Sequence, residues 1–210
     1  MNIENLKDLE AEFLDEYPKG FDDERLLKLM KKFNPDKLEK ISKEAFDKKN
    51  FSQPDLICQN FINIISKSVV ISFYDKLKLK DAFINMGMYE KDMFSIALYD
   101  ILYKNKKEGF DSIVEILSKY NLAKWTLITI IPYYMNRKND YFIKPTTAKN
   151  IINYLELDNL IYKPRPSYEF YVNYKKNLDK LKKVTQKSFT KDNICFTAFL
   201  RLGIEICITH

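Results

Sequence analysis

The lysine at position 144 is the residue of this sequence whose surroundings best suit binding chemistry. Lys144 follows the run Tyr141-Phe142-Ile143 and precedes Pro145. A residue before proline is biased toward an extended backbone, and proline fixes its own φ angle, so this turn is stiff. Held beside Tyr141 and the single tryptophan, Trp125, the ammonium group can be presented to an anionic ligand. The alternative is that this stretch is only a core helix and its connector.

A longer run of basic residues lies near the end of the chain. Between Lys163 and Lys191 nine bases stand against two acids, whereas Met1 to Glu24 carries nine acids and two bases. Arg165, Lys175 and Lys176 alternate with tyrosines, and such mixtures of rings and cations stack bases and neutralise phosphates. The alternative is that these lysines form the solvated side of an amphipathic helix whose tyrosines face inward.

The candidate ligand-binding residues therefore combine cations with two aromatic rings. They are Lys67, Lys76, Trp125, Tyr141, Lys144, Arg165, Lys175 and Lys176. The favoured function is a non-enzymatic binding protein for an anionic ligand, with nucleic acid as the leading candidate. The second hypothesis is a protein-interaction or self-assembly module. In that case the acidic N-terminal helix pairs with the basic helix of a partner or of another copy, and the second of these alternatives predicts a homo-oligomer.

The inventory of reactive side chains favours binding over catalysis. The single histidine, His210, is the last residue, which removes Ser-His-Asp and Cys-His arrangements unless the terminus folds back. Cys58, Cys195 and Cys207 lack the paired spacing of a metal site, and the four glycines are too scattered for a phosphate-binding loop. The sequence predicts no metal and no cofactor. An enzyme with a pocket of lysines and carboxylates is left open.

Composition predicts an all-α protein that folds as a single domain over residues 1–210, with a two-lobed arrangement as the alternative and no linker evident. Four glycines and seven prolines in 210 residues are too few for a many-turned β architecture, and helical periodicity accounts for roughly ten helices. The start carries no basic region followed by an apolar one, so we expect no signal peptide and a cytoplasmic location. Three widely spaced cysteines fit a reducing compartment better than a disulfide framework.

The stretch from Trp125 to Met135 is the longest nearly uninterrupted apolar run, and it is too short to cross a bilayer. It predicts a helix that is buried on most faces and that kinks or stops at Pro132. After Lys144, Pro145 suits a first helical turn, and Thr146 or Thr147 can cap that helix.

Other elements follow from periodicity and from breaking residues. Ser66 to Phe83 is predicted to be one helix, and Asn105 to Gly109 a charged loop. Ser167 caps a long helix after an irregular stretch from Asp158 to Pro166. The last helix starts at Asp192 and ends at Gly203. An earlier helix after Asp22 or Asp23 has its buried face on Leu26, Leu27, Met30 and Phe33.

Three blocks of the sequence resemble a family of small bacterial proteins of about 200 residues and uncharacterised activity. The blocks are YPKGFDD, SKSVVISFYDKLKLKDAF, and WTLITIIPYY with YFIKPTTAK and YKPRPSYEFY. Trp125 and Phe142-Ile143-Lys144-Pro145 match the family's tryptophan and its Phe-Leu-Lys-Pro. The family's late Asp-x-Ile-Asp pattern is replaced by Asp192-Asn193-Ile194-Cys195. The resemblance covers most of the chain and implies no activity.

Overall fold

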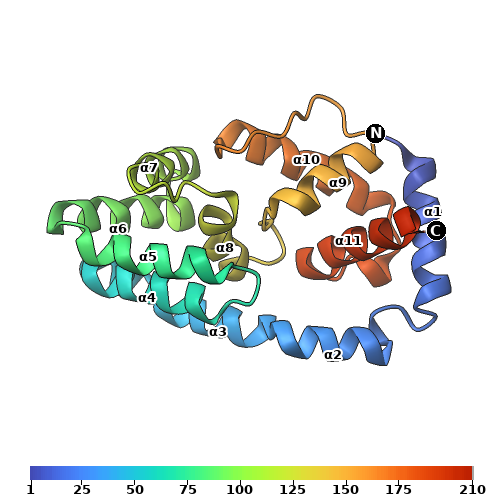
Figure 1. The fold of residues 1–210 in the computed structure, drawn as a ribbon, viewed down its shortest axis with the longest axis horizontal. Helices are drawn as coiled ribbons and strands as arrows, with labels where there is room; N and C mark the ends of the chain where they lie inside the picture. Colours follow the sequence, from blue (N-terminus) through green and yellow to red (C-terminus); the bar gives the residue numbers. More distant parts are fainter. Residues whose placement is uncertain (210) are drawn as a thin grey trace.

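The computed structural model describes residues 1–209, which form eleven α-helices and three short 3₁₀ helices (Figure 1). No β-strand occurs among these residues, so the prediction of an all-α fold with roughly ten helices is confirmed. In chain order the elements are α1 (Ile3–Glu16), η1 (Gly20–Asp22), α2 (Glu24–Phe33), α3 (Pro35–Ala45), η2 (Lys48–Ser52), α4 (Pro54–Lys67), α5 (Phe73–Asn85), α6 (Met88–Tyr103), α7 (Lys106–Ser118), α8 (Trp125–Met135), α9 (Pro145–Tyr154), α10 (Tyr168–Val184), η3 (Lys187–Phe189) and α11 (Asn193–Thr209).

Polar side chains explain where several helices begin. Five helices start with a side-chain oxygen that accepts a hydrogen bond from a first-turn backbone N–H. These residues are Asn2 for α1, Asp23 for α2, Ser72 for α5, Asn105 for α7 and Ser167 for α10. At α11, Asp192 accepts a hydrogen bond from the N–H of Cys195. Because first-turn amides lack partners inside the helix, each cap stabilises its helix by about 1 kcal/mol. The predicted cap at Ser167 is confirmed, and α11 begins at Asn193, one residue after the predicted start at Asp192.

The helices form two groups that share one hydrophobic core. Helices α4 to α8 gather on one side, α1 and α9 to α11 gather on the other, and α2 and α3 run along one edge (Figure 1). Buried side chains form a continuous cluster from Leu6 on α1 through Phe94 on α6 to Phe199 on α11. The chain is therefore a single domain.

Helix α8 lies near the centre and is buried on most faces, as its composition predicts. Of the two predicted outcomes at Pro132, a kink or a stop, the stop is wrong, because α8 continues to Met135. Pro132 removes only the hydrogen bond to Ile128, and the surrounding core holds the remaining turn in place. Within residues 1–209, no helix combines the length and the apolar character needed to cross a membrane.

The predicted single helix from Ser66 to Phe83 is two helices joined by a short connection. Helix α4 ends at Lys67, where the N–H of Ser68 bonds to the carbonyls of Ile64 and Ile65. Helix α5 begins at Phe73, after Ser72. Apolar periodicity runs through both helices, but the capping groups of the two serines break it. This connection carries Val69 and Val70 toward the cavity described below.

Two glycines that were expected to end or interrupt helices lie inside them instead. Residues Asn105 to Gly109 are not a loop, because α7 starts at Lys106. A Cβ atom on Gly109 would collide with the backbone of Ala97 and Ile101, so this glycine lets α7 lie against α6. Gly203 does not end α11, which runs on to Thr209, and a Cβ atom there would collide with Leu9 of α1. Both glycines permit close helix packing.

Candidate anion-binding pocket

A largely apolar cavity of about 210 Å³ opens between elements that are distant in the sequence. Helices α2, α8, α9 and α11 contribute its walls, together with the connections that precede α5 and α9. Its apolar lining includes Leu29, Met30, Val69, Tyr133, Phe142 and Leu202. The cavity therefore suits a ligand that is mostly apolar.

Lys144 lines this cavity. Its backbone is extended, with φ −95° and ψ 122°, and Pro145 follows as the first residue of α9, as the sequence predicts. The side chain is exposed, and it makes no hydrogen bond or ion pair with any residue of the described chain. An ammonium group has three N–H donors. All three are thus open to solvent or to a ligand.

Two hydroxyl groups at the cavity also lack hydrogen-bond partners within residues 1–209. Thr147 is only 9% exposed, and Tyr133 is half-buried. The prediction that Thr146 or Thr147 caps α9 is wrong, because Lys144 occupies the N-cap position and no side chain makes the cap hydrogen bond. The Thr147 hydroxyl is consequently left without a partner in the protein.

The start of α9 favours an anion beside Lys144. Burial, with Tyr134 and Asp192 nearby, raises the pKa of Tyr133, so its hydroxyl keeps the proton and can donate. The first intrahelical bond of α9 runs from Ala148 to the Lys144 carbonyl, which leaves the earlier amides unpaired. The N-terminus of a helix carries a partial positive charge of roughly half a unit. The unpaired amides of this first turn and its partial positive charge thus directly follow Lys144 in the chain.

Arg201 is the second cation at the cavity. It lies on α11 and pairs with Glu205, one turn further along, at 2.8 Å. This ion pair neutralises most of its charge, whereas Lys144 has no acid partner in the described chain. Lys144 therefore dominates the charge of the cavity.

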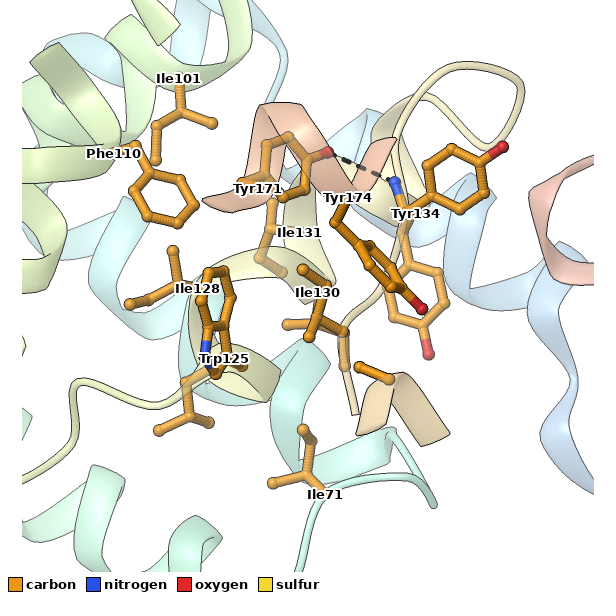
Figure 2. Packing of buried hydrophobic residues seen from close by; sticks show 14 of the residues in the cluster. Ile71, Ile101, Phe110, Trp125, Ile128, Ile130, Ile131, Tyr134, Tyr171 and Tyr174 are labelled. Atoms are coloured by element: carbon orange, nitrogen blue, oxygen red, sulfur yellow. Dashed lines mark hydrogen bonds between the residues drawn. The ribbon is translucent and has the colours of Figure 1, made fainter. Parts of the chain in front are cut away.

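Trp125 and Tyr141, two of the predicted site residues, lie in the core and outside the cavity lining. Figure 2 shows Trp125 close to Phe110 and Ile128. The indole N–H of Trp125 donates to the carbonyl of Lys163 at 2.8 Å. The Tyr141 hydroxyl donates to Asp179 at 2.9 Å, and burial together with this carboxylate raises the pKa of Tyr141. Both rings are fully enclosed by protein, and their polar atoms are satisfied.

Four of the predicted cations make contacts within the protein. At the junction of α4 and α5, Lys67 donates to the side chain of Asn63 at 2.8 Å and Lys76 to the carbonyl of Ser66 at 3.0 Å. Arg165 pairs with Glu115 of α7, and Lys175 pairs with Asp179 one turn further along α10. Arg165 and Lys175 are thus paired with acids, whereas Lys67 and Lys76 each donate to a neutral oxygen. The structure does not gather them around Lys144.

Lys176 differs from these four, because it is exposed and has no partner in the described part of the chain. Lys180 and Lys183 share these properties. Residues spaced by four and three positions lie on one face of a helix. The basic face that the sequence predicts is therefore reduced in the structure to these three lysines of α10.

Much of the cavity was not anticipated from the sequence, because its walls come from separate parts of the chain. Of the face predicted for α2, Leu26 is buried, but Leu27 is 44% exposed. Leu29, which was not predicted to be buried, is 40% exposed and lines the cavity. The only sequence signal near the cavity is Leu29, an apolar residue that lies outside the predicted buried face of this helix.

No protein-family model, curated protein or solved structure matches this chain, so the pocket alone supports a functional proposal. The resemblance to a family of small bacterial proteins stays a prediction. Among residues 1–209, no three histidine, cysteine or acidic side chains gather closely enough to hold a metal ion. His210 lies outside the described residues. Cys58, Cys195 and Cys207 are free thiols.

Proposed function

We propose that this protein binds a small amphipathic anion without catalysing a reaction. The observation that carries the proposal is an unpaired lysine, Lys144, at a largely apolar cavity. An apolar lining favours a hydrocarbon or aromatic group, and an uncompensated ammonium group favours a negative head group. A carboxylate with a medium-length chain or a ring combines the two.

The volume of the cavity limits the apolar part of the ligand. An apolar cavity of about 150 Å³ holds a benzene ring. A cavity of 210 Å³ therefore has room for one ring with a short side arm, or for a folded chain of medium length. Pockets for drug-sized molecules start at about 300 Å³. We therefore propose a ligand smaller than a nucleotide.

The polar groups assign a position to the head group. Lys144, the hydroxyls of Thr147 and Tyr133, and the first-turn amides of α9 are all donors without protein acceptors in the described chain. Donors of this kind hold a carboxylate or a phosphate through charge-assisted hydrogen bonds. We place the head group beside Lys144 and the apolar part toward Met30 and Leu202.

The experiment is isothermal titration with octanoate and octyl phosphate, which share the chain and differ in the head group. We expect the wild-type protein to bind at least one of them. Ala198 lines the cavity from α11, so Ala198→Phe adds a ring where the chain would lie and should abolish binding.

The matched control adds the same ring outside the cavity on the same helix. Ile208 is 65% exposed on α11, and Ile208→Phe should leave binding unchanged. Failure of the wild-type protein to bind either probe, or equal binding by Ala198→Phe, would contradict the proposal.

Nucleic acid is the second candidate, favoured by the three unpaired lysines on one face of α10: Lys176, Lys180 and Lys183. If three phosphates are contacted, raising the salt concentration from 50 to 200 mM should weaken nucleic-acid binding by about 40-fold. Fluorescence anisotropy with a labelled oligonucleotide measures this loss. If nucleic acid is the ligand, Lys176→Gln should weaken binding and Lys144→Met should not. If octanoate binding is weakened by Lys144→Met and not by Lys176→Gln, the result supports ligand binding in the pocket.

A further inference from the structure

Helices α5 and α6 expose large apolar side chains on faces directed away from the core. Phe73, Met88 and Tyr89 are 75%, 79% and 74% exposed. The set that defines this face, which we call the α5–α6 face, is Phe73, Leu77 and Ile84 on α5 and Met88, Tyr89 and Ile96 on α6. It is separate from the cavity, whose lining includes none of these residues.

The exposed residues of α5 follow a helical pattern of their own. Phe73, Leu77 and Ile84 are spaced by four and seven positions, so they line one stripe of the helix. The opposite side of α5 is buried through Leu79 and Phe83. The helix therefore has two apolar faces, of which the protein covers only one.

The two helices contact each other through their buried sides. Phe83 of α5 and Phe94 of α6 pack edge to face with ring centroids 4.8 Å apart, and Phe61 of α4 contacts both rings. Figure 1 shows α5 and α6 lying next to each other on the same side of the molecule. Ile84 and Met88 flank the bend at Gly87 that joins the helices. The exposed apolar stripes of α5 and α6 thus approach each other at this bend, through Ile84 and Met88.

We infer that the α5–α6 face binds a second copy of this chain. With Tyr74 and Met93, which adjoin the six defining residues, its exposed apolar area is on the order of 900 Å² at roughly 150–200 Å² per large side chain. The largest apolar patch of a typical monomer is about 300–600 Å². A stable interface buries about 800 Å² on each partner. The face has the area that a dimer needs.

The charges along this face are balanced, as expected for a surface that binds a second copy of itself. From residue 73 to residue 96 four lysines balance four acids, so this part of the two helices carries no net charge. In a symmetric dimer the same patch is used twice, and any net charge would repel itself. A basic membrane-binding face or an acidic-peptide site would be dominated by one sign. The charge balance therefore favours a second copy over these partners.

Analytical ultracentrifugation across a range of concentrations tests this inference. We expect a dimer of the 25.0 kDa chain that dissociates on dilution. Ile84→Glu and Tyr89→Glu should each raise the dissociation constant at least about tenfold, because they place a charge in a desolvated interface. The control is Ile161→Glu at an 81% exposed position far along the sequence, which should leave the dimer intact.

A pair of charge variants decides whether the occupant is the same chain. Lys80→Glu makes the face negative and Asp81→Lys makes it positive, so each variant alone should be monomeric. An equimolar mixture of the two should dimerise again, since the two faces then attract each other. Circular dichroism checks that every variant remains folded, which the exposure of both positions leads us to expect.

Three results would overturn the inference. The first is a wild-type protein that stays monomeric at submillimolar concentration. The second is a dimer that Ile84→Glu and Tyr89→Glu leave unchanged. The third is a monomer that floats with phosphatidylcholine and phosphatidylglycerol vesicles and loses this binding on Ile84→Glu, which would assign the face to a lipid surface.

Discussion

The surroundings of Trp125 and those of Lys144 belong to the same part of the chain but differ in how their polar groups are satisfied. Around Trp125 the indole N–H, the Tyr141 hydroxyl and the Tyr171 hydroxyl all have protein partners. Around Lys144 the ammonium group and the Thr147 hydroxyl have none in residues 1–209. The region around Trp125 satisfies its hydrogen-bond donors within the protein, whereas the region around Lys144 leaves donors available for a ligand.

This difference separates a structural role from a binding role more sharply than residue type does. A buried polar group without a partner costs about 1–3 kcal/mol, so cores satisfy their donors. A binding site can leave donors unpaired at the cost of some stability. We therefore expect substitutions near Trp125 to change stability, and those near Lys144 to change binding.

The largest effect should come from Trp125→Ala. The side chain is 1% exposed and packs against Phe110 and Phe170. Truncating it should lower the free energy of unfolding by about 3–5 kcal/mol, measured by urea denaturation. A loss below about 1 kcal/mol would show that the region is not the tightly packed core described above.

Two lysines with different partners offer a matched comparison. Lys106 pairs with Asp140, which is 3% exposed and also accepts a hydrogen bond from Tyr171. Lys106→Met should cost about 1–3 kcal/mol, because it strands a buried carboxylate while Lys106 itself is partly exposed. Lys144→Met should be neutral or stabilising in thermal melts. Equal losses of stability for the two variants would indicate that Lys144 has a structural role.

The region around Trp125 should also make the protein sensitive to alkali. Burial raises the pKa of Tyr141, Tyr171 and Tyr174 above their ordinary value of 10.0. Their protonated forms therefore stabilise the folded state fully below about pH 10. Above it, the unfolded chain loses protons first, and the free energy of unfolding should fall by about 1.4 kcal/mol per pH unit for each such tyrosine.

Urea denaturation at a series of pH values measures this slope, and Tyr174→Phe should reduce it by removing one buried phenol. A free energy of unfolding that stays constant well above pH 10 would contradict the burial of these hydroxyls.

A smaller pair of effects distinguishes two tyrosine hydroxyls. Tyr141→Phe removes the hydrogen bond to Asp179 and should cost about 1–2 kcal/mol. Tyr133→Phe removes a hydroxyl that has no partner in the described chain and should change stability by less than about 0.5 kcal/mol. Urea denaturation measures both free energies of unfolding. Similar losses for the two variants would contradict the proposed difference between the two regions.

The sequence was sufficient for features that depend on local chemistry. The helical class, the cap at Ser167 and the start of α9 at Pro145 follow from residues within one turn of each other. Gly109 and Gly203 were misjudged because their role depends on Ala97 and Leu9, which come from other helices. From the sequence alone, a glycine indicates the end of a helix, because the residue that packs against it from another helix is not known.

The same reasoning applies to the candidate site. Lys144 could be singled out because it precedes a proline and follows the aromatic residues Tyr141 and Phe142. The cavity could not be predicted, because Met30, Tyr133 and Leu202 meet only when α2, α8 and α11 pack together. Trp125 and Tyr141 were grouped with Lys144 by their nearness in the sequence, and tertiary packing separates them from the cavity.

The most direct test compares octanoate with 1-octanol as ligands of the wild-type protein and of Lys144→Met. The two ligands share the chain that we place in the cavity and differ in charge. Losing one charge-assisted hydrogen bond should weaken octanoate about 10- to 100-fold. Lys144→Met should leave 1-octanol unchanged, and Lys138→Met, at an exposed lysine outside the cavity, should change neither. Equal octanoate affinities for the wild-type protein and Lys144→Met would contradict the assignment of Lys144 as the anion-binding group.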